Sequence, residues 1–192
     1  MAGAGLLWVG WFGFNAASAV AADGRAGLAM AVTHITASAG ALSWMAAEWL
    51  ARGRPSLLGL CSGLVAITPA AGYVSPGSAV VFGVVAGVAC YWGATGLKRL
   101  LKADDSLDVF GVHGVGGIVG SLLTGVFASK SISGVEGSVL VQFVGVASVM
   151  AYSLVMTGLL LWLTSLCVRL RVDETAESDG LDIDQHAERL GT

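Results

Sequence analysis

Long apolar stretches, separated by short segments rich in polar residues, glycine or proline, make up most of the chain. A helix needs about 20 predominantly apolar residues to cross the hydrocarbon core of a bilayer. Six stretches meet this requirement, and they run over Ala4–Ala22, Gly27–Leu50, Leu57–Val74, Ser78–Leu97, Val109–Ala128 and Val139–Val168. The pattern therefore predicts an all-α fold, a polytopic membrane helix bundle of about six transmembrane helices.

Composition supports this prediction and adds a boundary near the end of the chain. Hydrophobic residues make up 55% of the sequence and charged residues 12%, whereas an ordinary soluble domain has about 25% charged residues. Seven acidic residues fall between Val172 and Thr192, where Arg189 is the only basic residue. We therefore expect a transmembrane domain over residues 1–170, an acidic tail over residues 171–192, and no nucleic-acid partner.

Basic residues between the apolar stretches predict the orientation of the chain, because Lys and Arg are retained on the cytoplasmic side. The first stretch lacks the basic segment that begins a signal peptide, so it is interpreted as a span. Two basic residues, Arg25 and Lys130, then fall on one side of the membrane. Eight fall on the other side, namely Arg52, Arg54, Lys98, Arg99, Lys102, Arg169, Arg171 and Arg189. We expect a multi-pass protein of the cell membrane with its acidic tail in the cytoplasm.

Two histidines lie inside predicted spans, where an ionisable group is costly and so becomes a candidate for function. His113 is flanked by small residues in the fifth span, and His34 lies in the second. Either ring could instead be a structural residue with its hydrogen bonds satisfied. Cys61, Cys90 and Cys167 are far apart and lack C-x-x-C spacing, so neither a disulfide framework nor a metal site is predicted. We expect no cofactor.

An aromatic and hydroxyl face is predicted on the first span. Trp11, Phe14 and Ser18 follow i, i+3, i+7 spacing, which places them on one side of an α-helix. Aromatic rings could hold a small cation through their quadrupole, although the same spacing is also typical of simple packing. In the third span, Thr68-Pro69 predicts a kink, because proline removes a backbone donor.

Glycines recur at a spacing that favours close helix packing in lipid. Pairs four residues apart lie on one helix face and let two backbones approach each other. Three such pairs are present, namely Gly59/Gly63, Gly83/Gly87 and Gly116/Gly120. We predict packing roles for them.

Three motifs together resemble the ammonium transporter family (Amt/Mep/Rh). They are WFGFNAASA at Trp11–Ala19, EWLARGRPSLLG followed by ITPAAGYV between Glu48 and Val74, and LKRLLKADDSLDVFGVHGVGGIVGSLLTGVFA at Leu97–Ala128. The resemblance extends across nearly the whole chain. It implies transmembrane transport of ammonium or ammonia and no enzymatic activity.

The resemblance also implies an architecture and roles for single residues. Family members have eleven helices, arranged as two inverted five-helix repeats and a final helix, and they form trimers with one pore per subunit. This chain resembles the second repeat and the final helix. By resemblance, His113 is a pore histidine of the proton relay and should face a narrow dry conduit. Phe14 gates the outer vestibule, Ser18 belongs to the ammonium recruitment site with Trp11 beside it, and the tail meets a cytosolic nitrogen-regulatory protein.

Residues that the family supplies from its first repeat have no counterpart here, which leaves three hypotheses. The chain could be half of a transporter that needs a first-repeat partner. Two copies could pair in antiparallel fashion, although the biased distribution of basic residues argues against dual topology. Alternatively, the chain is a non-conducting remnant or a regulatory membrane subunit. Relative to the family pattern, about one helical turn is also missing after Gly63, which would shift the following residues by about 5.4 Å.

An enzymatic alternative rests on Ser62 and His113, because six spans with a serine and a histidine are also found in intramembrane serine proteases. Leu60 occupies the first position of the G-x-S-G pattern of that class, so the motif is absent. The sequence therefore favours a transporter.

Overall fold

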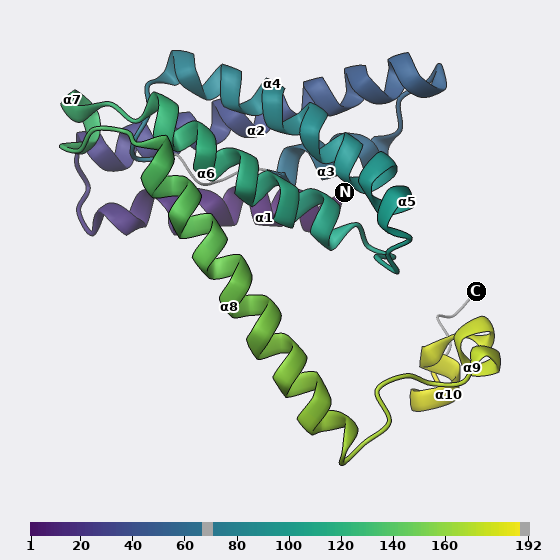
Figure 1. Cartoon of the computed structure of the whole chain (residues 1–192). Helices are drawn as coiled ribbons and strands as arrows, with labels where there is room; N and C mark the ends of the chain where they lie inside the picture. Colours follow the sequence, from purple (N-terminus) through teal and green to yellow (C-terminus); the bar gives the residue numbers. More distant parts are fainter. Residues whose placement is uncertain (67–70, 189–192) are drawn as a thin grey trace. The chain divides into compact units, whose positions relative to one another are not determined.

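The structure is a computed structural model that describes residues 1–66 and 71–188 (Figure 1). Within these ranges every regular element is a helix, so the predicted all-α membrane fold is confirmed. The chain divides into two units, Met1–Val146 and Ala147–Thr192, and each is described by itself.

The first unit contains most of the helices of the chain. In its first half lie α1 (Ala2–Trp11), the π-helix η1 (Phe12–Ala16), the 3₁₀-helix η2 (Ala17–Ala19), α2 (Gly24–Arg52), α3 (Leu57–Val65) and α4 (Pro76–Trp92). These are followed by the π-helix η3 (Gly93–Leu97), α5 (Lys98–Leu101), the π-helix η4 (Phe110–Gly114), α6 (Val115–Phe127), α7 (Lys130–Ser133) and the start of α8 (Val139–Ser165).

Among the described residues, four helical stretches are long and apolar enough to cross a membrane. They are Gly24–Arg52, Pro76–Leu101, Phe110–Phe127 and Val139–Ser165, which confirms the second, fourth, fifth and sixth predicted spans. The first predicted span consists of α1, η1 and η2, three kinds of helix in succession. In the third, α3 ends at Val65, and the kink predicted at Thr68-Pro69 lies outside the described residues.

Polar residues between the apolar stretches fix where the helices begin and end. The side chain of Asp23 accepts hydrogen bonds from the first amides of α2, at 2.9 and 3.0 Å, and Ser56 caps α3 in the same way. Ser75 caps α4, and Pro76 occupies its first turn, where the missing N–H costs nothing. At its other end, α2 stops at Gly53, whose φ of 74° is left-handed.

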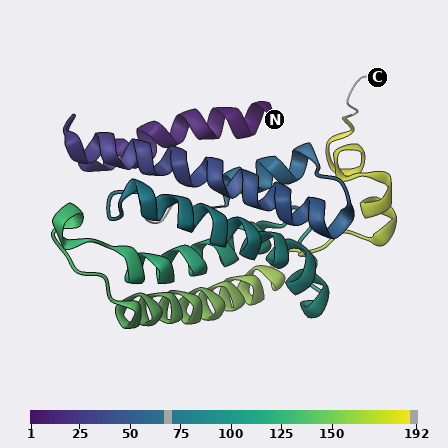
Figure 2. The same ribbon diagram turned by 90° about the horizontal axis from the view of Figure 1, so that it is seen from above.

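The core of the first unit lies where α2 crosses α4 and α3 (Figure 2). An added Cβ at Gly83 would lie 2.6 Å from the Thr36 carbonyl oxygen, and one at Gly40 would lie 2.6 Å from the Gly63 carbonyl oxygen. No side chain larger than hydrogen fits at these crossings. All six glycines of the predicted pairs are buried, so their packing roles are confirmed.

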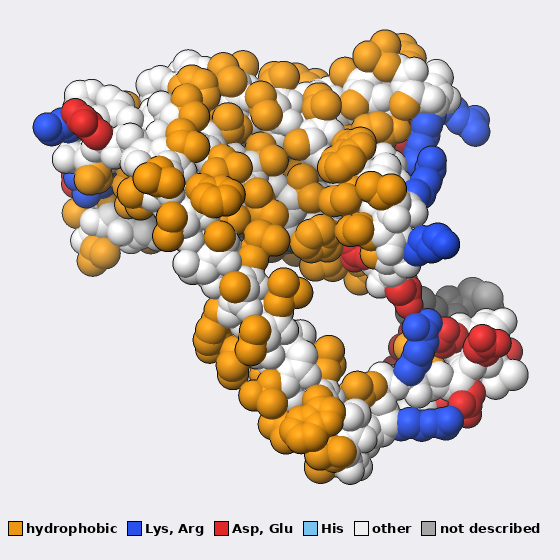
Figure 3. All heavy atoms as spheres, in the orientation of Figure 1, with side chains coloured by type: hydrophobic (Ala, Val, Ile, Leu, Met, Phe, Trp, Pro, Cys, Tyr) orange, Lys and Arg blue, Asp and Glu red, His pale blue; other side chains and the backbone are white. Residues whose placement is uncertain are grey.

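Much of the surface of the first unit is apolar, and most of its basic side chains gather at the end where α5 lies (Figure 3). Arg52 at the end of α2 lines the same pocket there as Lys98, Arg99 and Lys102. The segment after the second predicted span and the segment after the fourth were predicted to share one side of the membrane. They do lie at one end of the unit.

The second unit comprises the remainder of α8 and the two short helices α9 (Glu174–Asp179) and α10 (Leu181–His186). No residue of α8 is buried. In the tail, the guanidinium of Arg171 pairs with the Glu177 carboxylate at 2.8 Å, and Arg169 pairs with Asp173 at 3.1 Å. These exposed ion pairs join the few basic residues near the tail to its acidic groups.

Candidate pore-lining site

The first candidate segment, around Phe14, is not α-helical. Phe14 lies in the π-helix η1, and 76% of its surface is exposed. Ser18 is also exposed, and its hydroxyl donates to the Phe14 carbonyl oxygen at 2.8 Å. Trp11 is half-buried and packs against a cluster on α2 and α3. The spacing that predicted one shared face assumed α-helical geometry, so Trp11 and Phe14 have different surroundings.

Ser18 opens onto a small polar pocket at the end of the first unit that lies opposite to α5. The pocket has a volume of about 270 Å³, and its lining includes Asn15, Ser18, Arg25 and Tyr73. The Asn15 amide donates to the Thr33 hydroxyl at 2.9 Å and so ties η1 to α2. Hydroxyl and amide oxygens at this pocket are acceptors for a small cation.

His113, the second candidate, lies in the π-helix η4 and is exposed. The Asp105 carboxylate caps its segment by accepting from the amides of Val109 and Phe110, at 2.8 and 2.9 Å. The described residues of this chain do not enclose the ring. The narrow conduit around His113 therefore stays a prediction, and it would need other residues to cover the exposed side of the ring. Neither π-helix was foreseen, although Gly111 and Gly114 in η4 are a weak signal of irregular helix.

The histidine of the second span, His34, makes ring contacts with the first. Its imidazole stacks on Trp8 with centroids 5.0 Å apart and lies 5.9 Å from the ring of Phe12. The indole nitrogen of Trp8 is buried and has no hydrogen-bond partner among the described residues. These contacts favour the packing interpretation of His34.

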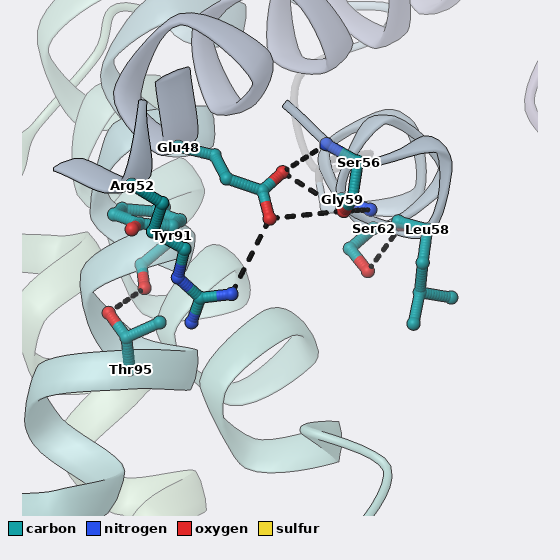
Figure 4. A network of polar contacts seen from close by, with 8 residues as sticks. All are labelled: Glu48, Arg52, Ser56, Leu58, Gly59, Ser62, Tyr91 and Thr95. Carbon is teal, nitrogen blue, oxygen red and sulfur yellow. Dashed lines mark hydrogen bonds and ion pairs between the residues drawn. The ribbon is translucent and has the colours of Figure 1, made fainter. Parts of the chain in front are cut away.

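A buried carboxylate, which the sequence did not single out, lies at the other end of the unit (Figure 4). Only 4% of the surface of Glu48 is exposed. Its carboxylate accepts from the Ser56 amide at 2.9 Å and from the Ser56 hydroxyl at 3.0 Å, and the Arg52 guanidinium lies 3.5 Å away. Gly59 leaves the space that this carboxylate fills. The sequence signal that could have identified Glu48 is an acidic residue near the end of a long apolar helix.

Glu48 borders a basic pocket of about 520 Å³. Lys98 lines this pocket and pairs with Asp108 across 2.7 Å. Ser62 also lines it, and its hydroxyl donates to the Leu58 carbonyl of its own helix at 3.1 Å. Among the described residues no hydrogen bond joins Ser62 to His113, so the geometry gives the protease alternative no support.

Fold and site together define a class of protein. The chain is a polytopic helical membrane protein that exposes an imidazole and a phenyl ring on irregular turns within apolar helices. Ionisable groups in such positions mark ion and substrate pathways rather than packing against lipid. Such an arrangement is expected of membrane channels and transporters.

Comparison with known proteins gives the family. The sequence profile of the Ammonium Transporter Family matches residues 1–190. The chain is 40% identical to the ammonium transporter of Bacillus subtilis over 200 residues, which cover 97% of this chain and 50% of that protein. The chain belongs to the ammonium transporter family, and the resemblance predicted from its motifs is confirmed.

Solved structures agree with this assignment. Saccharomyces cerevisiae Mep2 superposes with a TM-score of 0.81 at 38% identity, over 90% of this chain and 43% of that one. A sensor Amt protein superposes with a TM-score of 0.87 at 30% identity, over 95% of this chain and 47% of that one. The chain thus spans about half the length of the relatives it matches.

Proposed function

We propose that this chain forms one wall of a pore that conducts ammonium or ammonia across the cell membrane. The observation that carries the proposal is the exposed imidazole of His113 on an apolar span, in a chain that belongs to the ammonium transporter family. A histidine turned toward lipid would be costly, so its exposed ring needs a polar path or another polypeptide beside it.

The physics of ammonium permeation suits these residues. A bare ammonium ion cannot enter hydrocarbon without a large desolvation cost, whereas neutral ammonia can. In the proposed mechanism the Ser18 pocket and the exposed ring of Phe14 hold the cation, with Trp11 packed beside them. The cation then passes Phe14, which acts as the gate, and transfers its proton to the acceptor nitrogen of the neutral His113 imidazole, so that ammonia moves on uncharged. His113 carries the proton, because a neutral imidazole has one donor and one acceptor nitrogen.

The second wall of the pore is proposed to come from another polypeptide segment equivalent to the first repeat. Phe14 and His113 are both exposed among the described residues, and such a segment would cover them. A homotrimer with one pore in each subunit completes the proposed assembly. The bias in the distribution of basic residues, which includes Arg52 and Lys98, supports a cytoplasmic location for this end of the first unit and, separately, for the tail.

Uptake of methylammonium by cells that lack their own ammonium transporters tests this proposal. The chain is expressed alone, and together with the half of the Bacillus subtilis relative that it does not match. We expect uptake by the pair and its loss in His113→Ala, with His186→Ala in the tail as the matched control. Absence of uptake by the pair, or equal uptake with His113→Ala, would contradict the proposal.

A second candidate function is that of a regulatory membrane subunit whose acidic tail binds a cytosolic nitrogen-regulatory protein. The likeness to a sensor Amt protein favours it. Deletion of Val172–Thr192 should then abolish binding of the purified regulatory protein to the chain in nanodiscs while the helical bundle stays folded. Equal binding with and without the tail would exclude this function.

A further inference from the structure

Two π-helices of the first unit, η3 and η4, pack directly against each other. An added Cβ at Gly93 would lie 2.7 Å from the Gly111 carbonyl oxygen, and one at Gly111 would lie 2.6 Å from the Ala94 nitrogen. The two backbones are therefore in contact with no side chain between them. Such irregular helical turns are rare and are often found at functional sites.

Two polar contacts join the residues on either side of η3 to η4 and to the segment just before it. The buried thiol of Cys90, in the last two turns of α4, donates to the Val112 carbonyl oxygen at 3.3 Å. Val112 directly precedes His113 in the chain. At the start of η4, Asp108 pairs with Lys98, the residue that follows η3. The backbone carbonyl beside the candidate pore histidine is thus held from a neighbouring helix.

We infer that Cys90, Gly93 and Gly111 are positioning residues that set the direction of the His113 ring. A π-turn contains one more residue than an α-turn, and an α-helix advances about 100° per residue. Conversion of η4 to α-helix would therefore turn the residues before η4 by about 100° relative to α6, and His113, which lies inside the turn, by part of that angle. The consequence of this rotation for transport rests on the function proposed above, but the rotation itself does not.

Nuclear magnetic resonance of the imidazole nitrogens tests the inference directly. The full chain is reconstituted in lipid nanodiscs with ¹⁵N-labelled histidine, and the signals of its three histidines are assigned by single His→Gln variants. Gly111→Ala and Cys90→Ala should shift the His113 signals and leave those of His34, which lies against Trp8 and Phe12. Cys90→Ser keeps a hydrogen-bond donor and should restore the His113 signals.

A control variant separates positioning from general loss of packing. Gly40→Ala disturbs an equally close crossing, that of α2 with α3, without touching η4. It should leave the His113 signals in place even where it lowers stability. Unchanged His113 signals in Gly111→Ala, or equal shifts of His34 and His113, would overturn the inference.

Two further measurements keep the inference testable. One needs no packing variant that could fail to fold, and the other links the inference to the proposed function. The infrared S–H band of Cys90 in the otherwise unchanged chain, with Cys61 and Cys167 replaced by alanine, should show a hydrogen-bonded thiol. A band at the free-thiol frequency would refute the contact without any packing variant. In the uptake assay, Cys90→Ala should alter the pH profile of methylammonium uptake, and Cys90→Ser should restore it. If no assembly transports, the proposed function fails while the resonance experiment still decides the positioning role.

Discussion

Removal of the buried carboxylate at Glu48 should weaken the end of the bundle where α2 turns into α3. Its carboxylate accepts from both the amide and the hydroxyl of Ser56, and a hydrogen bond to a charged group contributes about 1.5–3 kcal/mol. Arg52 is half exposed, with 52% of its side chain accessible, so its ion pair adds only about 0–1 kcal/mol. We expect Glu48→Ala to lower the free energy of unfolding by about 3 kcal/mol or more.

Glu48→Gln should cost less than Glu48→Ala, because the amide keeps the shape of the side chain and one acceptor oxygen. Reversible unfolding in mixed detergent micelles, followed by the fluorescence of the six tryptophans, measures both losses. The matched control is Glu136→Ala. Glu136 is exposed, and its only described ion pair, with the exposed Lys130, is long at 4.0 Å and therefore weak. If Glu48→Ala and Glu136→Ala destabilised the chain equally, the buried network would have no stabilising role.

Three further predictions concern packing, pairing and capping. Gly83→Val should lower the free energy of unfolding by about 1–3 kcal/mol through a clash at the crossing of α2 and α4. Gly145→Val, at a position with open space around it, should change this free energy little. Unfolding in micelles measures both variants, and equal losses would contradict the close crossing. A double-mutant cycle on Lys98 and Asp108 should give a coupling of about 0.5 kcal/mol that falls in high salt, because both side chains are about one-third exposed; a coupling of zero at low salt would refute the pair. Asp105→Ala should cost about 1 kcal/mol and shift the imidazole ¹⁵N signals of η4, because the cap of that helix is lost; unchanged signals and stability would argue against the cap.

Sequence patterns could predict most of the fold, because spans, caps and glycine pairs are local signals. Four of the predicted spans are confirmed, and their boundaries follow from residues such as Asp23 and Ser75, whose side chains cap the helices that come after them. The spacing of Gly83 and Gly87 predicted a close approach without identifying α2 as the neighbour. Local signals thus locate elements, whereas their partners depend on the folded chain.

The candidate site was harder to predict. Phe14 and His113 were singled out by residue type and motif, but their π-helical setting depends on contacts between distant segments, as between Gly93 and Gly111. Glu48 was missed because its partner, Ser56, is reached only after the chain turns at Gly53. Hydrophobic periodicity carries no information on a hydrogen bond of this kind.

The crossing at Gly40 limits how this bundle can move. Gly40 lies within van der Waals distance of the backbones of α3 and α4 at once, through Gly63 on one side and Gly83 and Gly87 on the other. Three helices that touch backbone to backbone cannot slide past one another without breaking contact along their length. In the proposed pore, opening and closing therefore falls to side chains that are free to change rotamer, and the exposed ring of Phe14 is one of them.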